Sequence, residues 1–180
     1  MRKIFSVGIV TLLSFLTFSL PGFASEIPKY LEGVKNLRHP TSTLYVAGQP
    51  KPDAFVAFAK AGVAHVINLR PPQEAPELNA ATIVTNAGMA YYNIPIAGAD
   101  DLTRDSVQQL DTLLGKIGNE KVLIYCSSGN RVGALMALRA AWMQNASIEE
   151  AIKIGDRYGL TKLRSDVRKL LTQEPSLQKK

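Results

Sequence analysis

The 180-residue sequence is short of the residue types that build disulfides, metal sites and nucleotide sites. Cys126 is its only cysteine, so no disulfide can form within these residues. The two histidines, His39 and His65, lie far apart, and no pair or triplet of residues has the spacing of zinc ligands. A glycine-rich nucleotide loop is also lacking. The sequence therefore implies neither a metal nor an organic cofactor.

Charge of one sign is not in strong excess either. The formal net charge is +6, from 21 basic and 15 acidic residues. Much of the excess lies near the C-terminus, in Lys162, Arg164, Arg168, Lys169, Lys179 and Lys180. No aromatic residues interleave with these side chains, so a solvated helical face explains them better than a nucleic-acid interface. We therefore expect no nucleic-acid partner.

One long hydrophobic run stands at the start of the sequence. Two basic residues precede an apolar and hydroxyl stretch over residues 4–20, and Gly22 and Ala24 fit the −3 and −1 positions of a cleavage site. The alternative is an uncleaved membrane anchor, for which the run is of borderline length. We expect a signal peptide over residues 1–24, and a single mature domain over residues 25–180. That domain would be periplasmic or secreted, without stable insertion in a membrane.

Short apolar runs alternate with helical patterns through the remaining sequence. Strands are expected over residues 43–48, 64–70, 90–96 and 121–126. Helices are expected over residues 52–62, from about Glu77 to Gly88, over 106–117, 131–144 and 147–155, and around Leu163, Val167, Leu170 and Leu171. This alternation predicts an α/β domain with a central, mostly parallel sheet of about four strands flanked by helices. Ligand sites in such sheets lie beyond the carboxyl ends of the strands, which here are residues 68–72, 97–101 and 126–131.

The stretch CSSGNR, residues 126–131, connects the expected central strand to a helix. Gly129 and Asn130 are residue types that adopt unusual dihedral angles, so the backbone can curl tightly. The N–H groups of such a loop point at one spot, at the positive end of the helix dipole, which suits an oxyanion and favours a thiolate. Cys126 is therefore a candidate nucleophile, and Arg131 a planar clamp for a tetrahedral anion. The alternative is a buried structural cysteine beside a surface arginine.

The same stretch resembles the loop of cysteine-dependent phosphatases, whose pattern is Cys-x5-Arg. Four segments in order, YVAGQP, VINLRPP, IPIAGADDLT and YCSSGNRVGAL, are similar to a bacterial branch of protein-tyrosine-phosphatase-like proteins related to the beta-lactamase-hydrolase-like phosphatase domain. The resemblance spans roughly residues 44–160. It implies a phosphatase-like domain that hydrolyses a phosphorylated small molecule or phosphoprotein.

The resemblance also implies roles for individual residues. The nucleophile that forms a thiophosphate is Cys126, the phosphate-binding loop is Ser127, Ser128, Gly129 and Asn130, and the transition-state clamp is Arg131. An aspartate from a separate loop would protonate the leaving oxygen. Asp100 is the favoured candidate for this role and Asp101 is the second. The alternative for both is a structural role, as acidic residues in a turn before a helix. Arg70, at the tip of the second strand, either adds positive potential or lies on the surface.

Three departures from the family pattern keep other functions open. Only four residues separate Cys126 from Arg131, which is the interval of rhodaneses, sulfurtransferases that carry a cysteine persulfide. Tyr125 and Val132 stand where the phosphatases usually have a histidine and a serine or threonine, and loss of that hydroxyl would slow hydrolysis of the intermediate. An exported phosphatase is the favoured hypothesis. A sulfurtransferase is the second, and an anion-binding module without turnover is the third.

Overall fold

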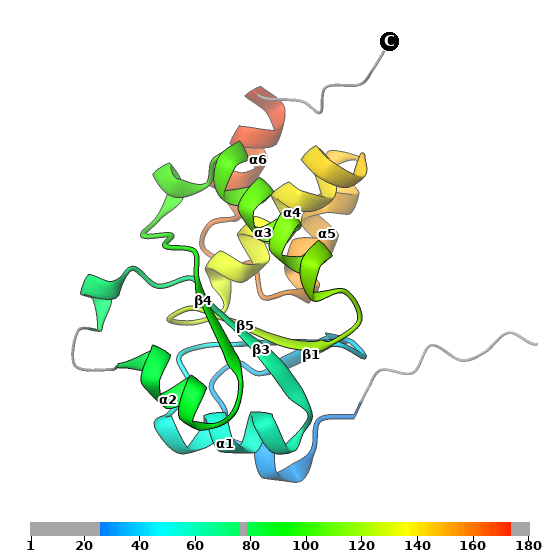
Figure 1. The fold of residues 1–180 in the computed structure, drawn as a ribbon. Helices are drawn as coiled ribbons and strands as arrows, with labels where there is room; N and C mark the ends of the chain where they lie inside the picture. The colour runs from blue at the N-terminus through cyan, green and yellow to red at the C-terminus, as the bar shows by residue number, and fades with distance from the viewer. Residues whose placement is uncertain (1–25, 76–78, 174–180) are drawn as a thin grey trace, which may run out of the picture.

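The computed structural model describes residues 26–75 and 79–173 (Figure 1). The expected signal peptide lies outside the described residues, as does the expected start of the second helix near Glu77. Within the described residues, no helix is both long enough and apolar enough to cross a membrane.

A five-stranded sheet in the order β1-β2-β5-β3-β4 forms the centre of the molecule. Its strands are β1 (Arg38–Thr41), β2 (Leu44–Ala47), β3 (Val63–Asn68), β4 (Ala90–Asn93) and β5 (Lys121–Tyr125). Strands β2, β5, β3 and β4 are parallel, and β1 pairs antiparallel with β2 at the edge. The predicted α/β class and mostly parallel sheet are confirmed. The fifth strand, β1, is an addition that the sequence did not reveal.

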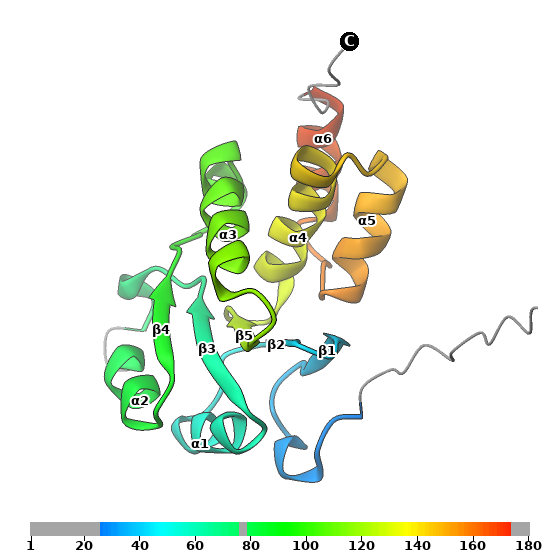
Figure 2. The ribbon, with the colours of Figure 1, turned by 45° about the vertical axis from the view of Figure 1, so that its right-hand side comes forward.

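Helices cover both faces of the sheet (Figures 1 and 2). On one face lie α1 (Pro52–Lys60) and α2 (Ala80–Asn86), and on the other α3 (Arg104–Ile117), α4 (Asn130–Gln144), α5 (Ile148–Arg157) and α6 (Arg164–Gln173). Three short 3-10 turns, η1 (Lys29–Leu31), η2 (Pro72–Glu74) and η3 (Ala99–Asp101), complete the described elements. The predicted end of the fifth helix at Gly155 is wrong. Helix α5 continues through this glycine because Gly155 packs closely on α4, where only a hydrogen fits.

The sheet separates two hydrophobic clusters, and β5 contributes to both. Val122, Ile124 and Cys126 lie in the cluster under α3 to α6, whereas Leu123 and Tyr125 lie in the cluster under α1 and α2. A strand buried on both faces reads as a continuous apolar run, which explains the sequence KVLIYC. The alternation also sends the Cys126 side chain towards the α4 face, just beyond the carboxyl end of the strand.

Candidate active site

The loop from Cys126 to Arg131 leaves the end of β5 and enters the first turn of α4. Cys126 is fully buried. Gly129 has a φ of 87°, in the left-handed region that favours glycine. Its N–H group donates to the Sγ of Cys126 at 3.1 Å. The loop therefore directs a backbone amide donor at the sulfur.

The carbonyl groups of this loop are held from outside. The N–H of Gln49 donates to the carbonyl of Ser127 at 3.3 Å, and Asn36 Nδ2 donates to the carbonyl of Ser128 at 2.9 Å. Because these two carbonyls are bonded to residues outside the loop, the N–H groups of the loop remain available on its inner side. The first amides of α4 have no partner within the helix and stand at the positive end of its dipole. The loop can therefore receive an oxyanion on its backbone.

Asn130 fixes the loop to the segment between α5 and α6. Its Oδ1 accepts hydrogen bonds from the Thr161 N–H at 2.8 Å and the Thr161 hydroxyl at 3.1 Å. Behind it, a Cβ on Gly133 would lie 2.1 Å from the backbone nitrogen of Leu160, so the two segments touch backbone to backbone. The Asn130 side chain thus supports the position of the loop. Only the backbone N–H of Asn130 remains for binding an oxyanion.

Arg131 connects the three strand tips that the sequence singled out. Its Nη1 donates to Glu74 Oε2 at 2.7 Å and to the carbonyl of Ile96 at 2.6 Å, and its Nη2 donates to Glu74 Oε1 at 2.6 Å. Glu74 follows β3, Ile96 follows β4 and Arg131 follows β5. The Arg131 side chain is only 12 % exposed. The hydrogen bond with Glu74 raises the pKa of Arg131, and the charge of Cys126 raises it further against the effect of burial.

Glu74 is the site residue that the sequence analysis missed. The hydrogen bond from Arg131 lowers the pKa of its carboxyl, and the charge of Arg70 lowers it further. The only available signal was an acidic residue four positions after Arg70, two residues beyond the strand tip over residues 68–72 that was expected to lie at the site. That signal does not say which side chain Glu74 would meet.

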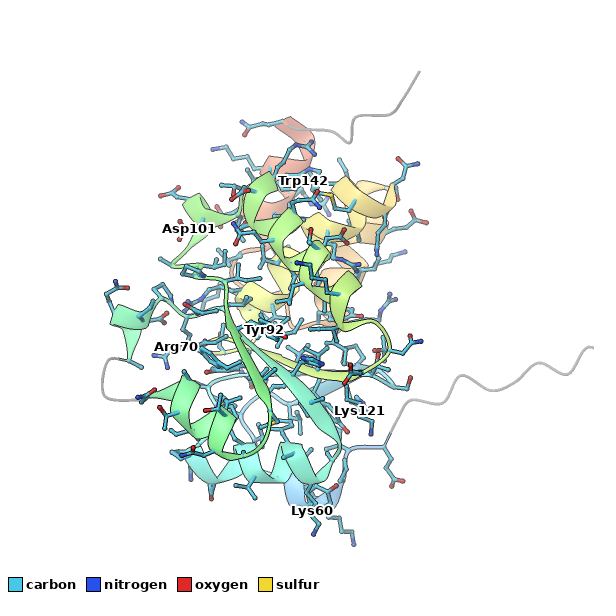
Figure 3. The ribbon with its side chains drawn as sticks, viewed as in Figure 1. Lys60, Arg70, Tyr92, Asp101, Lys121 and Trp142 are labelled. Carbon is cyan, nitrogen blue, oxygen red and sulfur yellow. The ribbon has the colours of Figure 1, made fainter. Side chains whose placement is uncertain are left out.

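Arg70 lies beside Glu74 and is mostly buried. Its Nη1 donates to Gln49 Oε1 and its Nη2 donates to the carbonyl of Glu74 at 2.8 Å. Figure 3 shows Arg70 and Asp101 on the same side of the molecule, with Lys121, at the start of β5, on the opposite side. Arg70 therefore adds positive charge near the carboxyl ends of the strands, and its hydrogen bond to the Glu74 carbonyl supports the turn that carries Glu74.

The two aspartates of η3 have different surroundings. Asp101 Oδ2 accepts the N–H of Ala97 at 2.6 Å, which closes the loop after β4. Asp100 is exposed, and its carboxylate has no hydrogen bond with any described residue. Of the two carboxylates, Asp100 is the one free to contact a substrate.

Tyr125 and Val132, which replace the usual histidine and hydroxyl residue, are both core residues. The ring of Tyr125 packs edge-on against Phe55 on the face away from Cys126, and burial raises the pKa of its hydroxyl. Val132 is fully buried in the same cluster as Cys126. In the described part of the chain, no three histidine, cysteine or acidic side chains gather as a metal site would require.

Comparison with known proteins agrees with this geometry. The profile of the family "Beta-lactamase hydrolase-like protein, phosphatase-like domain" matches residues 36–143. Beta-lactamase hydrolase-like proteins from two strains of Xylella fastidiosa are 32 % identical over 120 residues, which is 64 % of this chain and 27 % of each relative. The chain thus spans about a quarter of the length of these curated relatives.

Solved structures show the same fold. A DUF442 protein from Shewanella putrefaciens CN-32 has a TM-score of 0.62 at 22 % identity, over 81 % of this chain and 97 % of its own. Tk-PTP has a TM-score of 0.58 at 18 % identity, over 77 % and 97 %. A cysteine-to-serine variant of P. aeruginosa TpbA, in complex with phosphotyrosine, has a TM-score of 0.53 at 16 % identity, over 73 % and 80 %. The chain belongs to the phosphatase-like domain family of the beta-lactamase hydrolase-like proteins.

Proposed function

We propose that the protein hydrolyses phosphate monoesters through a thiophosphate on Cys126, in the manner of tyrosine and dual-specificity phosphatases. The observation that carries the proposal is the placement of Arg131. Glu74 and the carbonyl of Ile96 hold the guanidinium of this residue, which ends the loop that begins at Cys126. A thiolate and a fixed guanidinium together suit attack on a phosphoryl group.

In the first step, Cys126 Sγ attacks phosphorus, the S–P bond forms and the P–O ester bond breaks. Asp100 gives its proton to the leaving oxygen. The Gly129 N–H, the other loop amides and the free Nε edge of Arg131 stabilise the phosphoryl oxygens. In the second step, water attacks phosphorus and the S–P bond breaks. The thiolate returns, the proton of water passes to Asp100, and inorganic phosphate leaves.

Phosphorylated small molecules and phosphoproteins are both possible substrates in this proposal. The phosphotyrosine bound to P. aeruginosa TpbA supports an aryl phosphate as the first assay substrate. The signal-like residues 1–24 support export to the periplasm or the medium. Sequencing the N-terminus of the protein recovered from cell fractions tests export, and a chain that retains residue 1 in the cytoplasm would contradict it.

Release of p-nitrophenol from p-nitrophenyl phosphate by the reduced protein tests the proposed reaction. We expect turnover between about pH 5 and 8 that is lost in Cys126→Ser and Arg131→Met. Arg168→Met is the matched control, because Arg168 pairs with Glu149 on α5, remote from the site. A reduced protein with no turnover across this range would overturn the proposal.

The loop length favours one second candidate, a sulfurtransferase. Gly129 reaches the sulfur across a loop with only four residues between Cys126 and Arg131. Thiosulfate would give its outer sulfur to the Cys126 thiolate and leave as sulfite, and cyanide would take that sulfur as thiocyanate. Thiocyanate formation with a one-sulfur adduct on Cys126 favours this candidate. Absence of both removes it, and Asp100→Asn would not affect it.

A further inference from the structure

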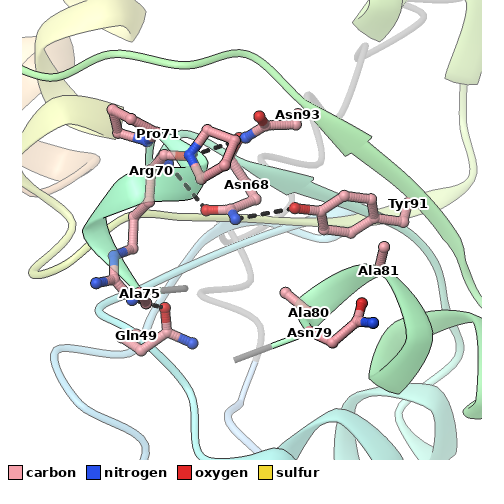
Figure 4. Close-up of a pocket in the computed structure, with 11 residues that line it drawn as sticks. Gln49, Asn68, Arg70, Pro71, Ala75, Asn79, Ala80, Ala81, Tyr91 and Asn93 are labelled. Atoms are coloured by element: carbon pink, nitrogen blue, oxygen red, sulfur yellow. Dashed lines mark hydrogen bonds between the residues drawn. The ribbon is translucent and has the colours of Figure 1, made fainter. Parts of the chain in front are cut away.

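A cavity of about 290 Å³ opens next to the candidate active site, on the α2 side of the sheet (Figure 4). Its polar lining consists of Gln49, Asn68, Arg70, Asn79, Tyr91 and Asn93. Prolines and alanines form the remainder. No residue of the loop from Cys126 to Arg131 lines it, so the chemical steps described above do not account for its polar character.

Two lining residues connect this cavity to the candidate active site. Gln49 places its side chain in the cavity wall, and its backbone N–H donates to Ser127 in the cysteine loop. Arg70 lines the cavity as well, and its Nε lies 3.7 Å from Glu74 Oε1. Glu74 in turn holds Arg131. Gln49 and Arg70 therefore border both the cavity and the groups that hold the cysteine loop and Arg131 in place.

Hydrogen bonds hold the floor of the cavity in one arrangement. Asn68, which is 8 % exposed, donates from Nδ2 to the hydroxyl of Tyr91 at 3.0 Å and accepts the Arg70 N–H at 2.9 Å. Asn93 Nδ2 donates to the carbonyls of Asn68 and Arg70 at 2.8 and 2.9 Å. A floor fixed in this way is preorganised, which lowers the entropic cost of binding a ligand.

Two of the polar residues keep a hydrogen-bond donor available. The hydroxyl of Tyr91 accepts from Asn68, so its own hydrogen is free. Asn79 Oδ1 caps α2 by accepting the Thr82 N–H, which leaves its Nδ2 group. The Gln49 side chain is already engaged, because its Nε2 donates to the Pro50 carbonyl at 3.0 Å and its Oε1 accepts from Arg70. In Figure 4, Gln49 lies on one side of the cavity, with Asn79 and Tyr91 on the other.

We infer that this cavity binds the leaving group of the phosphoester, and that this group carries hydroxyl oxygens, as sugar and polyol phosphates do. The inference rests on the proposed function and names its substrate class. A plain aryl group would exclude water from these two donors without pairing them, which disfavours it. The volume is near the lower limit of ligand pockets, about 300 Å³, and suits one compact ring.

Calorimetry tests the inference, with the Cys126→Ser variant used to prevent turnover. The readout is the ratio of the dissociation constants of phenyl phosphate and glucose 6-phosphate, which share the phosphoryl group. We expect glucose 6-phosphate to bind more tightly. Tyr91→Phe should then reduce the ratio by about 2- to 12-fold, the value of one hydrogen bond. Ala81→Leu, an exposed position on α2 that lines the cavity, should reduce it by filling the space.

Tyr92→Phe is the matched control. Tyr92 follows Tyr91 on β4, but its hydroxyl lies 3.4 Å from His65 and not in this cavity. Glucose 6-phosphate binding no tighter than phenyl phosphate, or a ratio that Tyr91→Phe and Ala81→Leu leave unchanged, would overturn the inference. Failure of the proposed function would give a different result from failure of this inference. The unmodified protein would then not hydrolyse p-nitrophenyl phosphate, whatever the ratio of the two dissociation constants.

Discussion

Glu74 and Arg131 form a two-point ion pair, with Nη1–Oε2 and Nη2–Oε1 distances of 2.7 and 2.6 Å. The residues are 57 positions apart in the sequence, and their contact joins the tips of β3 and β5. Two parallel hydrogen bonds fix the plane of a guanidinium, which a single contact does not. The Ile96 carbonyl also accepts from Nη1. The Nε edge therefore remains for a phosphoryl oxygen.

Replacing Glu74 with glutamine should weaken phosphate binding, because Arg131 then loses its orientation. The Glu74 side chain is 33 % exposed, so solvent screens the pair. We expect the KM for p-nitrophenyl phosphate to rise by about 3- to 10-fold with a smaller change in kcat. Glu74→Asp should restore part of the loss. Glu149→Gln, which breaks an exposed pair with Arg168, is the control. A lower KM in Glu74→Gln would contradict an orienting role and indicate competition with the substrate.

Acid should remove the stability that this ion pair contributes. The hydrogen bond from Arg131 holds the pKa of Glu74 below its ordinary value, which is about 4.3 in an unfolded chain. Because the folded-state pKa is the lower one, the contribution is fully present above about pH 4.3 and is lost as the pH falls through the folded-state pKa.

Urea unfolding of the wild type and Glu74→Gln measures this effect. The difference in free energy of unfolding should be constant from about pH 5 to 8, at below about 1 kcal/mol, and should shrink in more acidic solution. If the difference in free energy of unfolding grew in acid, it would not come from the Glu74–Arg131 ion pair.

The order of strands and helices was predictable because each element has its own hydrophobic period. Strand β1 was not, since RHPT has no apolar alternation and contains a proline. Its pairing with β2 at the sheet edge, where the exposed side needs no partner, allows it to form. The three tips of the site were predictable because the carboxyl ends of parallel strands share one edge.

Contacts between particular side chains were not predictable from spacing. Glu74 meets Arg131 only because η2 turns the chain back over the cysteine loop, and no local pattern encodes that turn. Gly155 looked like a helix end, but its position opposite α4 gives the glycine a packing role within α5. In both cases the deciding neighbour is distant in sequence.

Gly133→Ala should destabilise the protein and loosen the support of the cysteine loop. The added Cβ would lie 2.1 Å from the backbone nitrogen of Leu160 and 2.7 Å from the carbonyl oxygen of Gly155, and backbone cannot move aside cheaply. We expect a loss of about 3 kcal/mol in the free energy of unfolding, measured in urea. Gly115→Ala is the control, because no atom lies within 4 Å of its added Cβ in α3. It should stabilise the protein by about 0.5–1 kcal/mol. Equal effects at the two glycines would contradict the close packing.

Substitutions of Asp100 and Asp101 should have different effects on the kinetics and on the stability of the protein. Asp100→Asn removes the proposed proton donor, so the loss should depend on the leaving group. We expect kcat to fall by about 100-fold for an alkyl phosphate and by less than about 10-fold for p-nitrophenyl phosphate, whose leaving oxygen needs little protonation.

Asp101→Asn keeps a side-chain oxygen for the Ala97 N–H but removes its charge, so it should cost about 0.5–1.5 kcal/mol of stability. Any loss of activity should then be the same for both substrates. Rates with the two phosphates, together with urea unfolding of both variants, distinguish a proton donor from a loop anchor. A loss that depends on the leaving group in Asp101→Asn but not in Asp100→Asn would reverse the assignment, because only the residue that protonates the leaving oxygen can discriminate between the two esters.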